Sequence, residues 1–275
     1  MRAPGEAVLP RGLIGVIHLP ALPGDPGYAG GGFVEVQRRA LADAEALAEG
    51  GVDALIVENF GSAPFARGDA RQRASAASAA TLALLARRCI ERFALPVGLN
   101  CLRNDALTAL GAAAAAGADF IRVNIHTGAY VTDQGLIEGD AFETLRSRRA
   151  LEAETIGIAA DVLVKHATPL APISMKEAAR DCLGRGMADA VIVTGSATGA
   201  GVDRARLLEA REAAGDRPVW IGSGLTPENI ERLAPLADAA IVGTWLKEEG
   251  ALERPVSRAR VEQMASALRG RLRGG

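Results

Sequence analysis

Residues 116–124 read AGADFIRVN, which combines the end of a helix, a tight turn and the start of a strand. A glycine ends the helical segment, an aspartate follows two residues later, and a mostly apolar run begins. The same turn recurs as GGVD at 50–53 and as GMAD at 186–189. Glycine suits a helix C-terminus because it adopts left-handed backbone angles without strain. The repetition predicts one helix-to-strand unit used several times along the chain.

Short runs rich in valine, isoleucine and alanine alternate with helical patterns throughout the sequence. Such runs predict parallel strands that are buried on both faces. We expect eight of them, at Leu13–His18, Ala54–Glu58, Pro96–Asn100, Phe120–Asn124, Ala160–Lys165, Ala190–Thr194, Pro218–Gly222 and Ala239–Gly243. Eight strands with helices between them predict a single (β/α)₈ TIM barrel over residues 1–275. A doubly wound open sheet is the alternative, but it usually carries a GxGxxG motif after the first strand, where this chain has His18-Leu19-Pro20.

The composition argues against several classes of protein. The 31 basic and 33 acidic residues leave a formal net charge of −2, so no strong field attracts nucleic acid or anionic lipid. Residues 1–10 lack the apolar run of a signal peptide, and no apolar stretch is long enough to cross a bilayer. Three cysteines without a CxxC pair favour a reducing compartment. We therefore expect a cytoplasmic protein without an integral membrane segment.

Glycine-rich turns follow the seventh and eighth expected strands. The first precedes a helix that we expect Thr226 to cap and Pro227 to begin. Backbone N–H groups in such turns, together with a helix start, can hold a phosphate, and barrels often place one after these two strands. Tight turns that need glycine for backbone reasons are the alternative. The predicted phosphate-binding residues are Ser196, in a third turn after strand six, and Gly222, Ser223, Gly224, Gly243 and Thr244.

Polar side chains gather at the carboxyl ends of the expected strands, where barrel active sites are built. A polar group among buried valines and isoleucines is costly unless it is paired or used. All three histidines fall in this region. We predict catalytic roles for His18, Glu58, Asp161, Lys165 and His166, and substrate binding by Asn59, Asn100, Arg122, Asn124, His126 and Thr194.

Glu58 and Lys165 each allow more than one interpretation. Glu58 ends an apolar strand and can act as a general base if burial raises its pKa, or it can form an ion pair with Arg122 or Lys165. Period-two alternation places Asp161, Leu163 and Lys165 on one face of the fifth strand. The Lys165 amine can form a Schiff base, bind an anionic ligand, or serve structure alone.

No cofactor is predicted, and a divalent metal remains an alternative. His18, Glu58, His126, Asp161 and His166 offer suitable ligand atoms, but no HxH or HExxH spacing supports a metal site. Cys101 follows the third strand without a histidine beside it in the sequence, so we do not expect a nucleophilic cysteine.

Several longer phrases stand at the expected strand ends. They are GVIHLPALPG at 15–24, VENFG at 57–61 with APF at 63–65, RVNIHTGAY at 122–130, VKHA at 164–167, TGSATG at 194–199 and GSGLTPEN at 222–229. Together they resemble the BtpA/SgcQ family from about residue 11 to about residue 250. The resemblance implies a TIM barrel of the phosphate-binding type. The family often has an acidic residue where this chain has Ser62, so a metal or proton role of that acid would be absent here.

Two functions follow from these expectations. The first is an enzyme that acts on a small phosphorylated metabolite, a sugar or nucleoside phosphate, by isomerase, aldolase or glycosyl-bond chemistry. The second is a non-enzymatic assembly or stability factor for a membrane complex such as photosystem I, a role that the resemblance implies because the family's cyanobacterial namesake is linked to photosystem I accumulation. An assembly factor has no need for polar groups that converge on one barrel mouth, which favours the enzyme. We also expect a homo-oligomer, because barrels of this size often associate.

Overall fold

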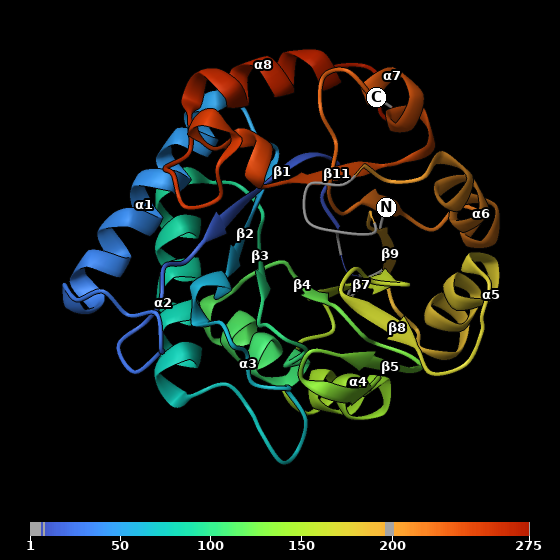
Figure 1. Ribbon diagram of the computed structural model, residues 1–275, viewed down its shortest axis with the longest axis horizontal. Helices are drawn as coiled ribbons and strands as arrows, with labels where there is room; N and C mark the ends of the chain where they lie inside the picture. The colour runs from blue at the N-terminus through green and yellow to red at the C-terminus, as the bar shows by residue number, and fades with distance from the viewer. Residues whose placement is uncertain (1–6, 8, 196–200, 275) are drawn as a thin grey trace.

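Eight parallel strands close into a barrel in the computed structural model, which describes residues 7, 9–195 and 201–274 (Figure 1). Around the barrel the order is β1, β2, β3, β4, β7, β9, β10 and β11, and β11 pairs with β1. Their bounds are β1 (Gly12–His18), β2 (Ala54–Glu58), β3 (Val97–Asn100), β4 (Phe120–Val123), β7 (Gly157–Val162), β9 (Ala190–Val193), β10 (Val219–Ile221) and β11 (Ala239–Val242). This confirms the predicted barrel.

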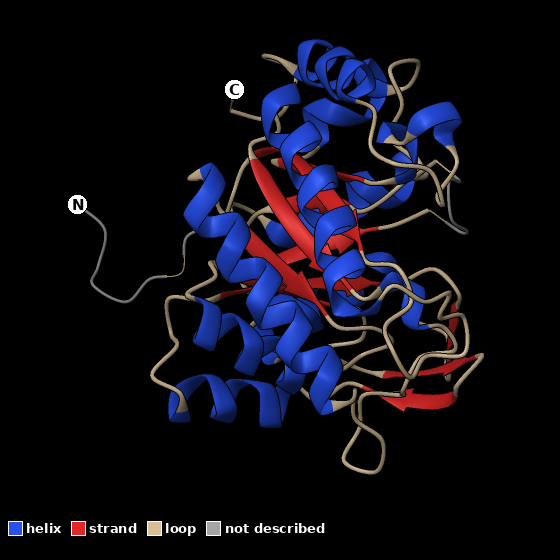
Figure 2. Ribbon diagram, turned by 90° about the vertical axis from the view of Figure 1, so that its left-hand side faces the viewer, coloured by secondary structure: helices blue, strands red, loops and turns tan. Residues whose placement is uncertain are grey.

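Helices surround the barrel and cover the outer faces of its strands (Figures 1 and 2). They are α1 (Gly32–Gly50), α2 (Ala76–Phe93), α3 (Ala106–Ala116), α4 (Ala141–Ala150), α5 (Met175–Arg180), α6 (Arg204–Ala214), α7 (Ile230–Leu233) and α8 (Arg258–Leu268). Shorter helical turns are η1 (Phe60–Ser62), η2 (Asp181–Arg185), η3 (Ala234–Leu236), η4 (Thr244–Leu246) and η5 (Glu248–Gly250). None of the helices in the described part of the chain combines the length and the apolar character needed to cross a bilayer.

A small antiparallel sheet lies outside the barrel, in the connections after β4 and β7. It consists of β5 (Ala129–Thr132), β6 (Gly135–Glu138) and β8 (Ala167–Pro169), in the order β6-β5-β8. The long connection after β4 is therefore partly a hairpin that pairs with the segment after β7. This pairing fixes both connections at the same end of the barrel.

Two layers of apolar side chains make the core. The strand residues that point into the barrel form one cluster, which includes Ile14, Val16, Ile56, Phe120 and Trp220. The Phe120 and Trp220 rings meet edge to face, with centroids 5.4 Å apart. The alternate strand residues pack against the helices in a second, larger cluster. Because strand side chains alternate between faces, this division determines which residues reach the barrel mouth.

The helix-to-strand turns follow the predicted rule at two of three places. Gly51 and Gly117 end α1 and α3 with left-handed backbones, φ 93° and 74°. Gly186 differs, because its φ is −76° and the left-handed residue is Met187. A Cβ at Gly186 would lie 2.5 Å from Thr127 Cγ2, so this glycine is needed for close packing rather than for its backbone angle.

Two predicted boundaries are wrong. The fifth barrel strand covers Gly157–Val162 rather than residues 160–165, and Leu163 already has a left-handed φ of 47°. The alternation argument that placed Lys165 on the face of Asp161 therefore fails. The helix after β10 begins at Ile230 rather than at Pro227, because Asn229 Oδ1 accepts from Thr226 N (3.0 Å) and holds residues 226–229 in a turn. A four-residue helix offers little dipole to a bound phosphate.

Candidate active site

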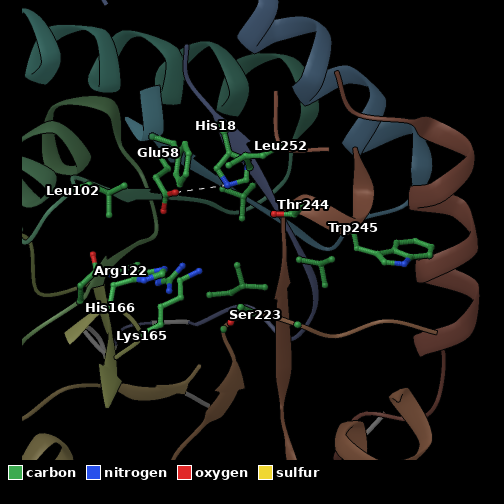
Figure 3. Close-up of a pocket in the computed structure, with 18 of the residues that line it drawn as sticks. His18, Glu58, Leu102, Arg122, Lys165, His166, Ser223, Thr244, Trp245 and Leu252 are labelled. Atoms are coloured by element: carbon green, nitrogen blue, oxygen red, sulfur yellow. Dashed lines mark ion pairs between the residues drawn. The ribbon is translucent and has the colours of Figure 1, made fainter. Parts of the chain in front are cut away.

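A cavity of about 710 Å³ opens at the carboxyl ends of the barrel strands (Figure 3). Most of the residues predicted for catalysis and phosphate binding line it, together with two of those predicted for substrate binding, Arg122 and Asn124. The others are His18, Glu58, Lys165, His166, Gly222, Ser223, Gly224, Gly243 and Thr244. They come from strands that are distant in the sequence and adjacent in the barrel. The structure therefore brings the two halves of the predicted site together.

Strand register explains why the polar residues meet. His18 pairs with Glu58, Glu58 with Asn100, and Asn100 with Arg122 along four neighbouring strands. Each of these residues lies two positions beyond an inward-facing residue of its own strand, as His18 follows Val16. The four side chains consequently form a polar layer on top of the apolar barrel interior.

Glu58 is held from two sides. Asn100 donates from Nδ2 to Glu58 Oε2 at 2.7 Å, and His18 Nε2 lies 3.7 Å from Oε1. Glu58 makes no ion pair with Arg122 or Lys165 in the described structure, so that alternative for its role has no support there. Its carboxylate is 6% exposed and faces the cavity, the placement a general base requires.

His18 is buried beside cations and remains neutral. Burial, with repulsion from Lys247, Lys165 and Arg122, lowers the pKa of His18 to about 3, against an attraction from Asp43. The 3.7 Å separation from Glu58 Oε1 exceeds hydrogen-bonding distance. A Cβ at Gly243 would lie 2.6 Å from His18 Cε1, so glycine at that position leaves room for the imidazole.

Arg122 is already neutralised by a carboxylate beneath the cavity. Its Nη2 lies 3.0 Å from Asp161 Oδ2, and Asn124 Nδ2 donates to the same oxygen at 2.7 Å. Burial alone would lower the pKa of Arg122, but the Asp161 and Glu58 carboxylates raise it above its ordinary value. Asp161 does not line the cavity, so it positions Arg122 and Asn124 rather than reaching a ligand.

Lys165 reaches the cavity from a turn rather than from a strand. Its backbone N–H donates to Thr194 Oγ1 (3.1 Å), and its carbonyl accepts from Arg103 Nη2 (2.8 Å). Burial and repulsion from Arg122 lower the pKa of the ammonium, against attraction to Glu58 and Asp161. Thr194 is buried and serves this anchoring, so a tertiary contact, not strand alternation, places Lys165.

The residues of the two glycine turns line the same cavity. Among the described residues, none accepts a hydrogen bond from the N–H groups of Ser223, Gly224 or Thr244. Ser223 Oγ accepts from Gly195 N at 3.2 Å, which ties this turn to the one after β9. Gly224 has a φ of 71°, a backbone conformation that glycine adopts readily. The predicted Ser196 lies outside the described residues.

Several predicted residues support the site without lining it. Asn59 Oδ1 accepts from Leu102 N (2.7 Å), which fixes the loop after β3. His126 Nε2 lies 2.8 Å from the Gly186 carbonyl, and burial lowers its pKa. Asn100 supports Glu58 from the side, as described above. These residues position the loops and side chains around the cavity.

Sequence reasoning missed Arg103 and an apolar wall. Arg103 follows β3 and is 6% exposed, and the wall consists of Phe60, Phe65, Trp245 and Leu252. Phe60 packs edge to face on His18, with centroids 5.2 Å apart. Arg103 could have been found in the sequence, because it is a cation three residues after the predicted end of the third strand. Aromatic residues close to expected strand ends, in a sequence with few aromatics, were the signal for the wall.

Metal ligands are sparse in the described part of the chain. No group of three or more histidine, cysteine, aspartate or glutamate side chains there is arranged to hold a metal ion. At the position where the family resemblance leads us to expect an acid, Ser62 Oγ donates to Asp25 Oδ2 at 2.6 Å. That position therefore contacts a carboxylate from the connection after β1.

Comparison with known proteins finds close relatives over most of the chain. A model of the BtpA family matches residues 10–270. The photosystem I biogenesis protein BtpA of Synechocystis is 44% identical over 256 residues, covering 93% of this chain and 87% of that protein. The sgc region protein SgcQ of Escherichia coli is 32% identical over 254 residues, covering 92% of each.

Solved structures share the fold at much lower identity. Phosphoribosyl anthranilate isomerase from Thermococcus kodakaraensis superimposes with a TM-score of 0.55 at 14% identity, over 94% of this chain and 99% of that one. Orotidine 5′-phosphate decarboxylase from Pyrococcus horikoshii does so with a TM-score of 0.57 at 13% identity, with the same coverage. These matches establish a TIM-barrel fold.

Proposed function

Because this chain belongs to the BtpA family, we propose that its barrel mouth is the active site of an enzyme that acts on a small phosphorylated metabolite, a sugar or nucleoside phosphate. One observation carries the proposal. The residues of the two glycine turns line the same cavity as Glu58 and Lys165, and the N–H groups of Ser223, Gly224 and Thr244 have no acceptor among the described residues. Backbone donors of this kind hold phosphate oxygens, and the side chains opposite them can do chemistry on the attached carbon skeleton.

The phosphate would sit between the turns after β10 and β11. Ser223 and Gly224 supply donors from one turn and Thr244 from the other, where η4 begins. The two solved barrels named above act, by their names, on phosphorylated compounds, which agrees with the proposal; the argument itself rests on the turns.

The chemistry we propose is proton transfer with charge stabilisation. Glu58 removes a proton from the substrate, from carbon in an isomerisation or from a hydroxyl group in an aldol cleavage, and keeps it on a carboxylate oxygen. Both reactions leave negative charge on a substrate oxygen. The Lys165 ammonium and the Arg122 guanidinium face the cavity and would stabilise that charge.

Binding of phosphate probes tests the anchor. Glucitol 6-phosphate at about ten times its dissociation constant should stabilise the fold by about 1.4 kcal/mol and raise Tm by about 3 °C, whereas glucitol should not. Gly224→Asp and Thr244→Glu should abolish the shift, because each adds a negative charge beside the phosphate. Gly224→Asn and Thr244→Gln are matched controls of nearly the same shape and should retain it. Equal behaviour of the charged and neutral variants would refute the phosphate site.

A Schiff-base mechanism is tested separately. The pKa of Lys165 is lowered by burial, which favours the neutral amine, the form that attacks a carbonyl group. Borohydride reduction in the presence of small phosphorylated aldehydes and ketones, followed by peptide mass spectrometry, would find an adduct at Lys165 if the amine is covalent. If no adduct forms and Lys165→Arg keeps turnover, the ammonium acts through its charge.

A second candidate function rests on the relative that is 44% identical and is named for photosystem I biogenesis. By that likeness this chain would assist the assembly of a membrane complex. Glu58→Gln separates the two functions. An assembly factor should retain its effect on complex accumulation with Gln at this position, whereas an enzyme should lose turnover by about a hundredfold or more.

A further inference from the structure

Two cations at the barrel mouth lack a carboxylate partner. Arg103, Arg122 and Lys165 all line the cavity, and Arg122 is neutralised by Asp161. Among the described residues, neither Arg103 nor Lys165 has a carboxylate oxygen within 4 Å. Two buried carboxylates, Glu58 and Asp161, therefore lie near three cations at the barrel mouth. Asp133 also lines the cavity, but it is exposed in the β5–β6 turn, where solvent screens its charge.

Arg103 is costly to keep in this position. The side chain is 6% exposed, and its Nε is buried without a hydrogen-bond partner in the described structure. Nη2 donates to the Lys165 carbonyl at 2.8 Å, which aims the guanidinium at the cavity and links it to the turn that carries Lys165. A buried guanidinium with an unused donor is destabilising unless a ligand supplies the acceptor.

The strand order places Arg103 across the barrel from the first glycine turn. β3, which precedes Arg103, and β10, which precedes the first glycine turn, lie opposite each other in the closed strand order. In Figure 3, Lys165 and Arg122 lie on the side of the cavity away from Thr244, and Ser223 lies between Lys165 and Thr244. A ligand anchored at the glycine turns would therefore extend across the mouth toward Arg103.

We propose that the substrate carries a second anionic group, a carboxylate or a second phosphate, which Arg103 and Lys165 bind opposite the glycine turns. Guanidinium groups hold both kinds of oxyanion through paired hydrogen bonds, and an ammonium adds a point charge. The inference rests on the proposed function and narrows its substrate class. The substrate class is then a phosphorylated compound that carries a second acidic group.

Three probes that differ at one carbon test the second anion. Glucitol 6-phosphate has a hydroxyl group at C1, 6-phosphogluconate a carboxylate, and glucitol 1,6-bisphosphate a phosphate. Calorimetric titration of the full chain should show one of the two probes with a second anionic group binding about tenfold to a hundredfold more tightly than glucitol 6-phosphate. The tighter of the two identifies the second group.

Variants test which residues produce this gain in affinity. Arg103→Met should remove the gain while changing the affinity for glucitol 6-phosphate by less than about twofold, and Arg103→Lys should restore part of it. The unchanged binding of glucitol 6-phosphate shows that the variant is folded. If Arg103→Met does not fold, Arg103→Gln carries the same test, since it removes the charge and keeps a side-chain amide that can donate to the Lys165 carbonyl.

The outcomes separate this inference from the proposed function. Equal affinities for the three probes in the wild-type protein, or a gain that persists in the folded neutral variant of Arg103, would overturn the second anion and leave the phosphate anchor standing. Failure of all three probes to bind would overturn the proposed function and this inference with it.

Discussion

Replacing His18 with glutamine should make the protein less sensitive to acid. His18 is buried against Glu58 and Phe60, and its pKa is lowered to about 3 by burial and by nearby cations. The unfolded chain titrates near the ordinary value of 6.5. A group whose pKa is lower in the folded state binds protons more readily when unfolded. Its stabilising contribution is therefore present above about pH 6.5 and is lost as the pH falls toward 3.

The size of this loss follows from the two pKa values. At pH 5 the folded state keeps His18 neutral, whereas in the unfolded chain this histidine is almost fully protonated. The free energy of unfolding then falls by about 2 kcal/mol relative to pH 7 on account of this side chain. Any folded-state pKa below about 4 gives the same figure, because His18 in the folded protein takes up almost no protons at pH 5.

Urea unfolding of the wild-type protein and His18→Gln at pH 7 and pH 5 measures the effect. Carboxylates and the other histidines titrate in both proteins. The wild type and the variant each lose free energy of unfolding between pH 7 and pH 5, and the difference between these two losses gives the contribution of His18. We expect the wild type to lose about 2 kcal/mol more than the variant between the two pH values. His166→Gln is the control: His166 is exposed at the same mouth, and its replacement should change the acid sensitivity less.

The opposite sign would refute this reasoning. If His18 were protonated and ion-paired with Glu58 in the folded state, its pKa would lie above 6.5. Acidification would then stabilise the wild type relative to His18→Gln. A wild type that loses less stability than the variant between pH 7 and pH 5 would therefore show that the 3.7 Å contact is an ion pair.

Three further predictions concern the scaffold. Asp43→Asn leaves the buried Lys247 ammonium without the carboxylate that lies 2.5 Å away, and urea unfolding should show a loss of about 3–5 kcal/mol. Gly61→Ala should prevent folding or shift the connection after β1, because a Cβ would lie 2.2 Å from the Ala21 backbone nitrogen; circular dichroism and yield of folded protein check this. All three cysteines are buried with pKa values raised by burial, that of Cys89 to about 12, so a thiol reagent at pH 8 should label none in the folded protein and three in urea.

The barrel could be predicted from the sequence because the patterns that indicate it depend on residues that are close together in the chain. A strand's inward face repeats every second residue, so Val16 and His18, or Ile56 and Glu58, fall on the same side wherever the strand is placed. Glycine at the helix ends and apolar runs after them are equally local. The polar ring and the glycine turns after β10 and β11 follow from this alternation and from the chain order of the strands.

The tertiary structure decided which of those groups face a ligand. Asn59 stands next to Glu58 in the chain, yet it binds the backbone of Leu102, 43 residues away. Lys165 enters the cavity because Thr194 and Arg103 hold its backbone after the strand has ended. Backbone periodicity is set by neighbouring residues and can be predicted from them. The direction of a side chain beyond a strand end depends on hydrogen bonds to distant segments, and folding alone brings those segments together.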